Sequence, residues 1–449
     1  MNNRFEVHSH DETSNIRLID CINKPKNLIK RAVELGLKGI AITNHECLSS
    51  AVSYDKIQKE LTESGSDFKI ALGNEIYLTE TRDKGQKYYH FILIAKDKVG
   101  FKQLRKLSSK AWLNSYADRG LERVPTLKSE LKAAIENNPG HLIATTACLG
   151  GELSTKVLEM ENARHIGDNE TADTKKAELI QFIFWCKELF GDDFYIECAP
   201  GKSKEQVIVN KKLVEIAAAM NVKMVIGCDA HFLKKEDRYV HKAYLNSKDG
   251  EREVDSFYEF SYLQSEEEII ENLTPSIVES YEVMCHNSME IYDKLESYSL
   301  AHPQQIPKVE VYDYPKNTWW ENSIEDYSLM SKYPVLKSMF VSDDKVERYW
   351  VNQCWDSLHK KVGEWKKHEK YVARLEEEAD VKRIISGKLH TNMFSYPVTL
   401  QHYIDLFWEC GSTVGAGRGS SCAGLNHYLL DVTQLDPLKW ELPFWRLEL

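Results

Sequence analysis

Short apolar runs alternate with stretches of mixed polarity over about the first 235 residues of the chain. The runs are rich in Ile, Val, Leu, Phe and Tyr, which is the composition typical of β-strands. They are nearly continuous in apolar residues, as expected for parallel strands that are covered on both faces. Seven strands are therefore predicted, at residues 5–8, 39–43, 69–73, 89–95, 142–145, 194–197 and 224–227.

Helical patterns separate several of these strands, for example at 25–35 and 204–220. Strands that alternate with helices predict an α/β fold, either a βα barrel or a doubly wound sheet. The segment 301–317 contains three prolines and is interpreted as a boundary or connector. Beyond it, the charged stretch 359–378 has the pattern of a solvated helix face, and an α/β-like piece is expected from about residue 396.

Composition and charge narrow the class of protein. The 449 residues suffice for about two to three domains. The sequence has no long apolar run and no apolar signal region, so a cytoplasmic protein without a membrane span is expected. Ten cysteines without a C-x-x-C pair argue against a zinc ribbon or a disulfide framework. The net charge of -11 argues against a nonspecific DNA coat, although a DNA enzyme with local basic patches stays possible.

Metal-binding residue types recur at the carboxyl ends of the predicted strands. In parallel βα folds these ends meet at one rim, where the loops form the active site. His8 and His10 are two positions apart on an extended segment, so both can reach one ion. Imidazole, carboxylate and thiolate bind zinc and related metals, and a carboxylate can bridge two ions. The candidate ligands at these strand ends are His8, His10, His45, Glu75, Cys148, Asp229 and His231.

Each of these residues also has an ordinary explanation when it is taken alone. A single H-x-H in a strand is more often structural or exposed than a ligand, and Cys148 could be a small buried hydrophobic residue. Asp229 could cap a following helix, and Glu75 could pair with a surface lysine. Their repetition at one place in the fold favours the metal site over these readings.

The order of the motifs adds a family resemblance. The segments H-S-H, T-N-H, G-N-E, Y-H-F-I-L-I-A-K, A-C-L-G-G-E and D-A-H follow one another as in polymerase and histidinol phosphatase (PHP) domains. The segment F-G-D-D-F-Y-I-E before D-A-H resembles in particular the PHP domain of the bacterial DNA polymerase III alpha subunit. The resemblance implies a distorted, TIM-like, seven-stranded βα barrel over residues 1–285 that binds up to three divalent ions, Zn, Mn or Fe.

The same resemblance implies nine metal ligands. It adds His90, at the start of a predicted strand, and Asp20, an acidic residue soon after H-S-H for which Asp11 is the competitor. Asn44 stands where the family usually has Asp and is expected to orient His45. The ligands expected to take part in catalysis are His8, His10, His45, Glu75 and Asp229. The complete implied set is His8, His10, Asp20, His45, Glu75, His90, Cys148, Asp229 and His231.

A glycine-rich, basic segment, V-G-A-G-R-G-S-S, forms a second motif. Its glycines let backbone amides approach a phosphate, which arginine and serine side chains can also bind. With D-P-L-K further on, it resembles the start of the polymerase III alpha palm, which is of the polymerase-beta-like nucleotidyltransferase type. The resemblance implies a connector over 286–317, an incomplete α/β palm over 318–449, and nucleotide binding by Gly417, Arg418, Gly419, Ser420 and Ser421.

The resemblance implies the N-terminal portion of a DNA polymerase III alpha subunit that acts in DNA replication. Its intact PHP site implies metal-dependent phosphodiester hydrolysis, with 3′-5′ exonuclease action on a primer end as the expected activity. No P-D-I-D motif follows the glycine-rich segment, so polymerisation and Mg²⁺ are expected only of a completed palm. Expected partners are DNA, a C-terminal polymerase portion and other replisome subunits. Two alternatives stay open: a stand-alone PHP phosphatase acting on a small phosphate ester, and a noncatalytic scaffold that completes a split polymerase.

Overall fold

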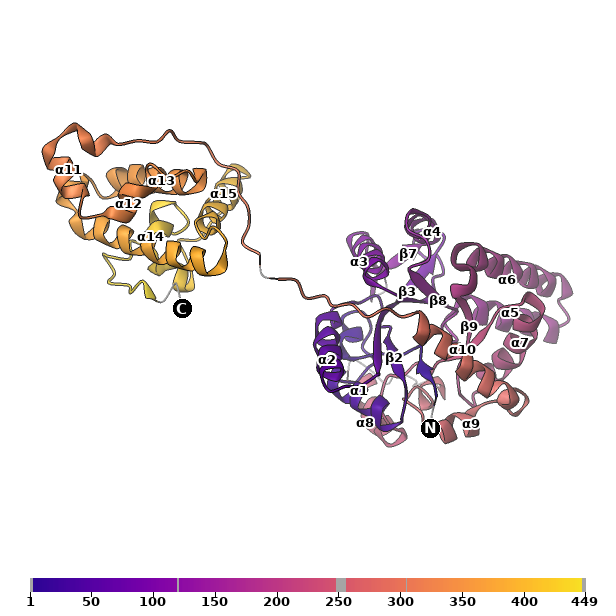
Figure 1. Ribbon diagram of the computed structural model, residues 1–449. Helices are drawn as coiled ribbons and strands as arrows, with labels where there is room; N and C mark the ends of the chain where they lie inside the picture. The colour runs from indigo at the N-terminus through magenta and orange to yellow at the C-terminus, as the bar shows by residue number, and fades with distance from the viewer. Residues whose placement is uncertain (1–2, 119–120, 248–255, 304, 446–449) are drawn as a thin grey trace. The chain divides into compact units, whose positions relative to one another are not determined.

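The computed structural model of the chain describes residues 3–118, 121–247, 256–303 and 305–445. The chain divides into two compact units, Met1–His302 and Pro303–Leu449 (Figure 1). Helix α10 (Tyr281–Lys294) crosses the boundary predicted at residue 285 and packs on strands of the first unit. Within the described ranges, none of the helices is both long and apolar enough to cross a membrane.

The main sheet of the first unit contains all seven predicted strands. Their order in space is β1–β2–β3–β4–β8–β9–β10, and the short strand β7 (Pro125–Leu127) pairs with the end of β3. A separate hairpin is formed by β5 (Tyr116–Asp118) and β6 (Leu121–Arg123). The strands of the main order are Phe5–Glu6, Gly39–Ile42, Lys69–Thr79, Tyr89–Ala95, Leu142–Thr145, Phe194–Cys198 and Met224–Ile226.

The direction of β4 differs from the prediction of parallel strands. β4 is antiparallel to both of its neighbours, β3 and β8, while the other neighbouring pairs in the main order are parallel. Its apolar run could not reveal this, because any strand covered on both faces has such a composition. The reversal brings the start of β4, and with it His90, to the rim at which the parallel strands end.

Backbone hydrogen bonds between the first and last strands nearly close the sheet into a barrel. The N–H of His10 donates to the carbonyl of Ala230 at 3.0 Å, and the N–H of Ala230 donates to the carbonyl of His8 at 3.3 Å. A small apolar core fills the interior, and it includes Ile291 of α10 and Leu295, which directly follows that helix. Its members include Phe5, Val7, Ala41, Ala71, Ile92, Ile94, Ile143, Val225, Ile291 and Leu295.

Helices cover the outside of the barrel (Figure 1). The helices predicted at 25–35 and 204–220 are confirmed as α1 and α7. α1 begins with Pro25, whose missing N–H costs nothing at a first helical position. The helices of this unit, apart from α10, are α1 (Pro25–Glu34), α2 (Ala51–Glu63), α3 (Lys98–Leu113), α4 (Lys128–Asn137), α5 (Glu152–His165), α6 (Asn169–Phe190), α7 (Lys204–Met220), α8 (Arg238–Leu245) and α9 (Glu266–Asn272).

The second unit is helical over residues 305–445, where the structure contains no strand. The α/β character expected of a palm is therefore not seen in this part of the chain. The charged stretch at 359–378 is only partly solvated, because α14 buries Tyr371, Val372 and Leu375 in the core of the unit. The helices are α11 (Ile324–Met330), α12 (Pro334–Met339), α13 (Lys345–Lys361), α14 (Glu369–Leu389), α15 (Ser395–Glu409) and α16 (Leu425–Leu429).

A fully buried carboxylate, Glu378, joins α14 to α16. Its oxygens accept from the backbone N–H groups of Leu425 at 2.7 Å and Asn426 at 2.8 Å. They also accept from the Asn426 side chain at 2.6 Å and from Nε of Arg374 at 3.0 Å. Because these four donors share one carboxylate as their acceptor, removing the carboxylate leaves several buried polar groups without a partner.

Glu378→Ala is expected to lower the free energy of unfolding of the second unit by about 3 kcal/mol, since two backbone N–H groups and Nε of Arg374 lose their acceptor. Urea unfolding followed by tryptophan fluorescence measures this change, because Trp320 and Trp350 lie in the core of this unit. Glu377→Ala removes the exposed neighbouring carboxylate and is the control. Equal losses of stability in the two variants would contradict the anchoring role.

Candidate metal centre

The nine ligands predicted from the sequence lie together at one rim of the barrel. They come from the ends of β1, β2, β8 and β10, from within β3, from the start of β4, and from the loop after β1. Eight of them are buried, and the His90 side chain is 23% exposed. The assembled set is His8, His10, Asp20, His45, Glu75, His90, Cys148, Asp229 and His231.

Glu75 lies at the centre of this group. Its Oε1 is 2.9 Å from Nδ1 of His90 and 3.5 Å from Nε2 of His8. Its Oε2 contacts Nδ1 of His45 and is 3.8 Å from Nε2 of His10. The carboxylate is fully buried, and neither oxygen has a hydrogen-bond partner among the described residues. Such a group is costly unless a cation compensates it, so the arrangement fits metal binding between the carboxylate and the imidazoles.

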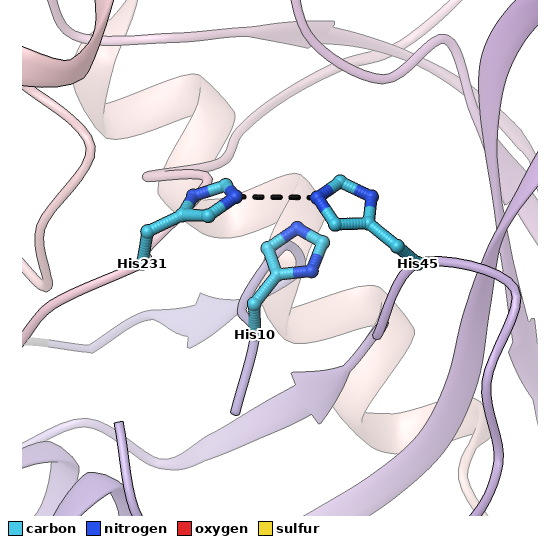
Figure 2. A group of neighbouring side chains, drawn as sticks. All are labelled: His10, His45 and His231. Carbon is cyan, nitrogen blue, oxygen red and sulfur yellow. Dashed lines mark hydrogen bonds between the residues drawn. The ribbon is translucent and has the colours of Figure 1, made fainter. Parts of the chain in front are cut away.

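The donor atoms form three overlapping groups, and within each group they lie within 4.8 Å of one another. Figure 2 shows the three imidazole rings of one group, with Nε2 of His45 and Nε2 of His231 3.3 Å apart. His10 and Glu75 each belong to two groups, so ions bound there would share ligands. The groups are His10–His45–His231, His8–His10–Glu75 and Glu75–His90–Cys148.

Asp20 joins the cluster, and Asp11 does not. Oδ2 of Asp20 is 3.0 Å from Nε2 of His45 and 3.4 Å from Nε2 of His231. Oδ1 of Asp20 is buried and has no hydrogen-bond partner among the described residues. Asp11 instead caps the turn after β1 and accepts from Nδ2 of Asn44 at 2.9 Å. The geometry therefore favours Asp20, where sequence spacing left both residues open.

Asp229 and Cys148 reach the cluster from sharp turns that follow their strands. Oδ1 of Asp229 is 3.1 Å from Nε2 of both His8 and His10. Asp229 has a φ of +46°, a left-handed conformation that is unfavourable for most side chains and is often found at functional sites. Sγ of Cys148 is 3.5 Å from Nδ1 of His90, directly after Ala147, whose φ is +56°. These turns aim both side chains inward instead of along their strands.

Hydrogen bonds on the far side of three rings set their orientation. Nδ1 of His8 lies 2.6 Å from Glu197 Oε1, and Nδ1 of His231 lies 2.8 Å from a backbone carbonyl. Nδ1 of His10 lies 3.1 Å from Oγ of Ser14. With Nδ1 as the donor in each pair, Nε2 is the nitrogen that faces the cluster, where it can bind a metal once it carries no proton.

Asn44 acts on the site through Ser14. The Ser14 hydroxyl donates to Oδ1 of Asn44 at 3.0 Å and accepts from the backbone N–H of His45 at 3.2 Å. The sequence led us to expect that Asn44 orients His45. In the structure, Asn44 holds the Ser14 hydroxyl, and Ser14 in turn contacts both the backbone N–H of His45 and the ring of His10.

Burial and neighbouring charges give the imidazoles different protonation states. Burial, together with the nearby His45 and His231, lowers the pKa of His10 to about 3. Burial also opposes protonation of His45, but Asp20 and Glu75 outweigh it and raise the pKa of His45 to about 10. His10 is therefore ready to bind a metal at neutral pH, whereas an ion at His45 must displace a proton.

Sequence reasoning missed Glu197, although it lies in β9 as part of F-G-D-D-F-Y-I-E. It accepts from the Thr145 hydroxyl and faces His8, so it supports the site without joining the ligand groups. A Cβ added at Gly227 would lie 2.4 Å from Oε1 of Glu197 and 3.0 Å from Cβ of His8. The signal that could have revealed Glu197 is its position near the carboxyl end of a barrel strand.

The glycine-rich loop lies on the surface of the second unit. Gly417, Arg418, Gly419 and Ser420 are exposed, and Ser421 Oγ is 3.0 Å from Nδ1 of His427. Gly417 and Gly419 have φ values of +138° and +61°, which glycine adopts readily. Helix α15, which precedes the loop, also exposes large apolar side chains, namely Tyr403, Leu406, Phe407 and Trp408.

Comparisons with known protein families match two separate parts of the chain. Residues 6–200 match the PHP domain, and residues 348–447 match the bacterial DNA polymerase III alpha NTPase domain. A solved structure of a proposed metal-dependent phosphoesterase from Bifidobacterium adolescentis covers 60% of this chain and 95% of its own, with 17% identity. Its TM-score of 0.29 is too low to support an inference.

Relatives match the chain over nearly its whole length. The DNA-directed DNA polymerase of Bacillus phage SPbeta is 39% identical over 459 residues, which cover 98% of this chain and 35% of the relative. The DNA polymerase III alpha subunit of Campylobacter jejuni is 27% identical over 453 residues, covering 98% of this chain and 34% of the relative. The chain thus spans about a third of the length of the curated relatives it matches. With its PHP domain and this match over nearly its whole length, the chain belongs to the DNA polymerase III alpha family.

Proposed function

We propose that the first unit is a metal-dependent phosphodiesterase that degrades single-stranded DNA from its 3′ end. The three overlapping ligand groups, joined through His10 and Glu75, are the observation that supports this most. Shared ligands would keep the ions close together, as in enzymes that cleave phosphate esters with two or more metals. When bound, such ions would polarise the phosphate and activate a water molecule.

The chemistry of the donors indicates the class of metal. Imidazoles predominate in the three groups, together with one thiolate and one carboxylate. This mixture suits Zn, Mn or Fe better than Mg, which prefers oxygen ligands. The remaining carboxylates, Asp20 and Asp229, lie against the histidines of these groups and would complete the ligand set.

The protein's own residues prepare the site for hydrolysis. His10 presents an unprotonated Nε2 because burial and its neighbours keep it neutral. Glu197 and Ser14 hold two of the rings in the orientation that binding needs. The partly exposed His90 marks the side from which a substrate would enter, and the burial of the other ligands excludes bulk water.

We also propose that the second unit takes part in nucleotide binding within a complete polymerase. The exposed loop with Arg418 suits a phosphate, and the loop lies in the region that matches the polymerase III alpha family. The partners of this unit would be DNA, replisome subunits and the other regions of the polymerase. The α/β palm that the resemblance implied over 318–449 is helical in its described residues, 318–445, and a need for Mg²⁺ stays a prediction of the family resemblance.

Metal content and 3′-end degradation test the proposed activity together. We expect about two or three ions per chain by elemental analysis, and stepwise shortening of a 5′-labelled single-stranded oligonucleotide. His10→Ala removes a ligand shared by two groups, so it is expected to lose at least one ion and nearly all activity. Arg418→Ala, in the second unit, is the control and should retain both.

Other outcomes would point to the alternative functions. Bound ions without any hydrolysis would contradict the nuclease and favour a noncatalytic scaffold. Hydrolysis of a small phosphate monoester, with the oligonucleotide left intact, would favour a phosphatase. Equal loss of hydrolysis in His10→Ala and Arg418→Ala would contradict the separation of the two units' roles.

Gly227→Ala is expected to weaken metal binding about 10- to 100-fold, because the added methyl group displaces Glu197 from Nδ1 of His8. Titration with Zn²⁺ against a competing chelator measures the affinity. Gly387→Ala, where the added carbon meets nothing within 4 Å, controls for the substitution itself. Wild-type affinity in Gly227→Ala would show that the contact between Glu197 and His8 does not support the site.

A further inference from the structure

A buried arginine lies beside the candidate metal centre and forms no ion pair with a carboxylate among the described residues. Arg17 is 7% exposed, and its Nε is buried without a hydrogen-bond partner among the described residues. Its guanidinium lies over the ring of Tyr77, with Cζ 4.7 Å from the ring centroid. Burying an unpaired charge is unfavourable, so this group is chemically suited to bind an anion.

Tyr77 connects Arg17 to the predicted metal ligands. Its ring stacks on His45 at a centroid distance of 6.1 Å and meets His90 edge-on at 5.0 Å. Tyr77 lies two residues after Glu75 in β3, so both side chains point to the same face, and it pairs with His90 across the strands. Arg17 is therefore separated from two ligands by a single aromatic ring.

Two carboxylates near Arg17 accept hydrogen bonds from asparagine side chains, while Oε2 of Glu46 has no hydrogen-bond partner among the described residues. Glu46, on which the charge of Arg17 acts, accepts from Nδ2 of Asn74 at 3.0 Å, and no ion pair joins it to Arg17 within the described structure. Asp11, on the same turn as Arg17, accepts from Nδ2 of Asn44 at 2.9 Å. The guanidinium thus keeps its capacity to bind an incoming anion.

The turn that carries Arg17 is built from residues that also orient a ligand. The backbone N–H of Arg17 donates to the carbonyl of Ser14 at 2.9 Å, and the Ser14 hydroxyl faces Nδ1 of His10. The position of the guanidinium is therefore linked to the geometry of the metal centre. A group that contacts a substrate phosphate beside the ions must keep a fixed position relative to them, and this turn provides such a position.

The more exposed edge of the site lies on the same side. Tyr88 is half-buried and meets Tyr77 edge-on at 5.3 Å, and Cζ of Arg123 lies 5.4 Å from the centroid of the Tyr88 ring. A substrate that approaches past the partly exposed His90 therefore meets aromatic rings and guanidinium groups. This combination suits a nucleotide, whose base can stack while its phosphate binds a cation.

We propose that Arg17 binds a non-bridging oxygen of the substrate phosphate beside the metal ions, with Tyr77 holding the plane of the guanidinium. The inference rests on the proposed phosphodiesterase function and adds a residue that binds the substrate itself. A guanidinium offers two parallel N–H donors to phosphate, a geometry that lysine cannot reproduce. Arg17 therefore favours a ligand with at least two phosphate oxygens within reach.

Calorimetric titration of the whole, Mn²⁺-loaded chain with inorganic phosphate tests this role. Arg17→Met keeps the length of the side chain but removes its charge, so it should retain wild-type ion content and bind phosphate roughly ten- to a hundredfold more weakly. Arg17→Lys keeps the charge without the planar fork and should fall in between. Arg105→Met is the matched control, because Arg105 is exposed on α3 and also lies over a ring, that of Phe101.

A single-stranded oligonucleotide with phosphorothioate linkages at its 3′ end, which resists hydrolysis, is titrated in the same way. Weaker binding of both probes to Arg17→Met is the expected result. Wild-type phosphate affinity in Arg17→Met with full ion content would overturn the proposal. If Arg17→Met does not retain its ions, Arg17→Lys decides, and wild-type affinity in that variant overturns the proposal equally. Absence of hydrolysis by the wild-type chain refutes the phosphodiesterase but leaves this binding comparison decisive.

Discussion

The buried carboxylate of Glu75 faces the rings of His8, His45 and His90, and neither of its oxygens has a hydrogen-bond partner among the described residues. Against the effect of burial, the neighbouring histidines hold its pKa well below the usual value, so the negative charge persists inside the protein. Positive charge must come from protonated imidazoles or from bound ions, and only ions also leave the imidazoles free to act as ligands. Metal binding and the stability of this rim are therefore linked.

The backbone makes this concentration of polar groups possible. The reversed direction of β4 places His90 opposite Tyr77 and beside the ends of the parallel strands. Glycine leaves room where two side chains would otherwise collide, since a Cβ at Gly150 would lie 3.0 Å from the ring of His90. The backbone is also strained at this rim, because Asp229 has a left-handed conformation. Local backbone features thus serve the site more than the barrel.

The seven strands could be predicted from the apolar runs, and most residues of the candidate metal centre could be brought to one rim because they follow strand ends. Strand direction could not, since burial on both faces gives β4 the same composition as its parallel neighbours. His90 consequently came only from family resemblance. Nor could spacing choose between Asp20 and Asp11, which depends on the path of the loop. An α/β-like piece was expected from about residue 396, yet α15 forms there and exposes apolar side chains such as Phe407, and sequence patterns do not report what covers a face.

One short segment, residues 8–20, joins most of these functions. It supplies the ligands His8, His10 and Asp20, as well as the turn that orients His10 and positions Arg17. The side chain of Asn23 fixes the segment to the last strand end by donating to the carbonyls of His10 at 3.0 Å and Ala230 at 3.1 Å. Because the candidate ligands and the guanidinium of Arg17 share this support, a shift of the segment would move them together. In the proposed function, a chain of net charge -11 would meet an anionic substrate through bound ions and Arg17, which act locally and do not depend on the overall charge.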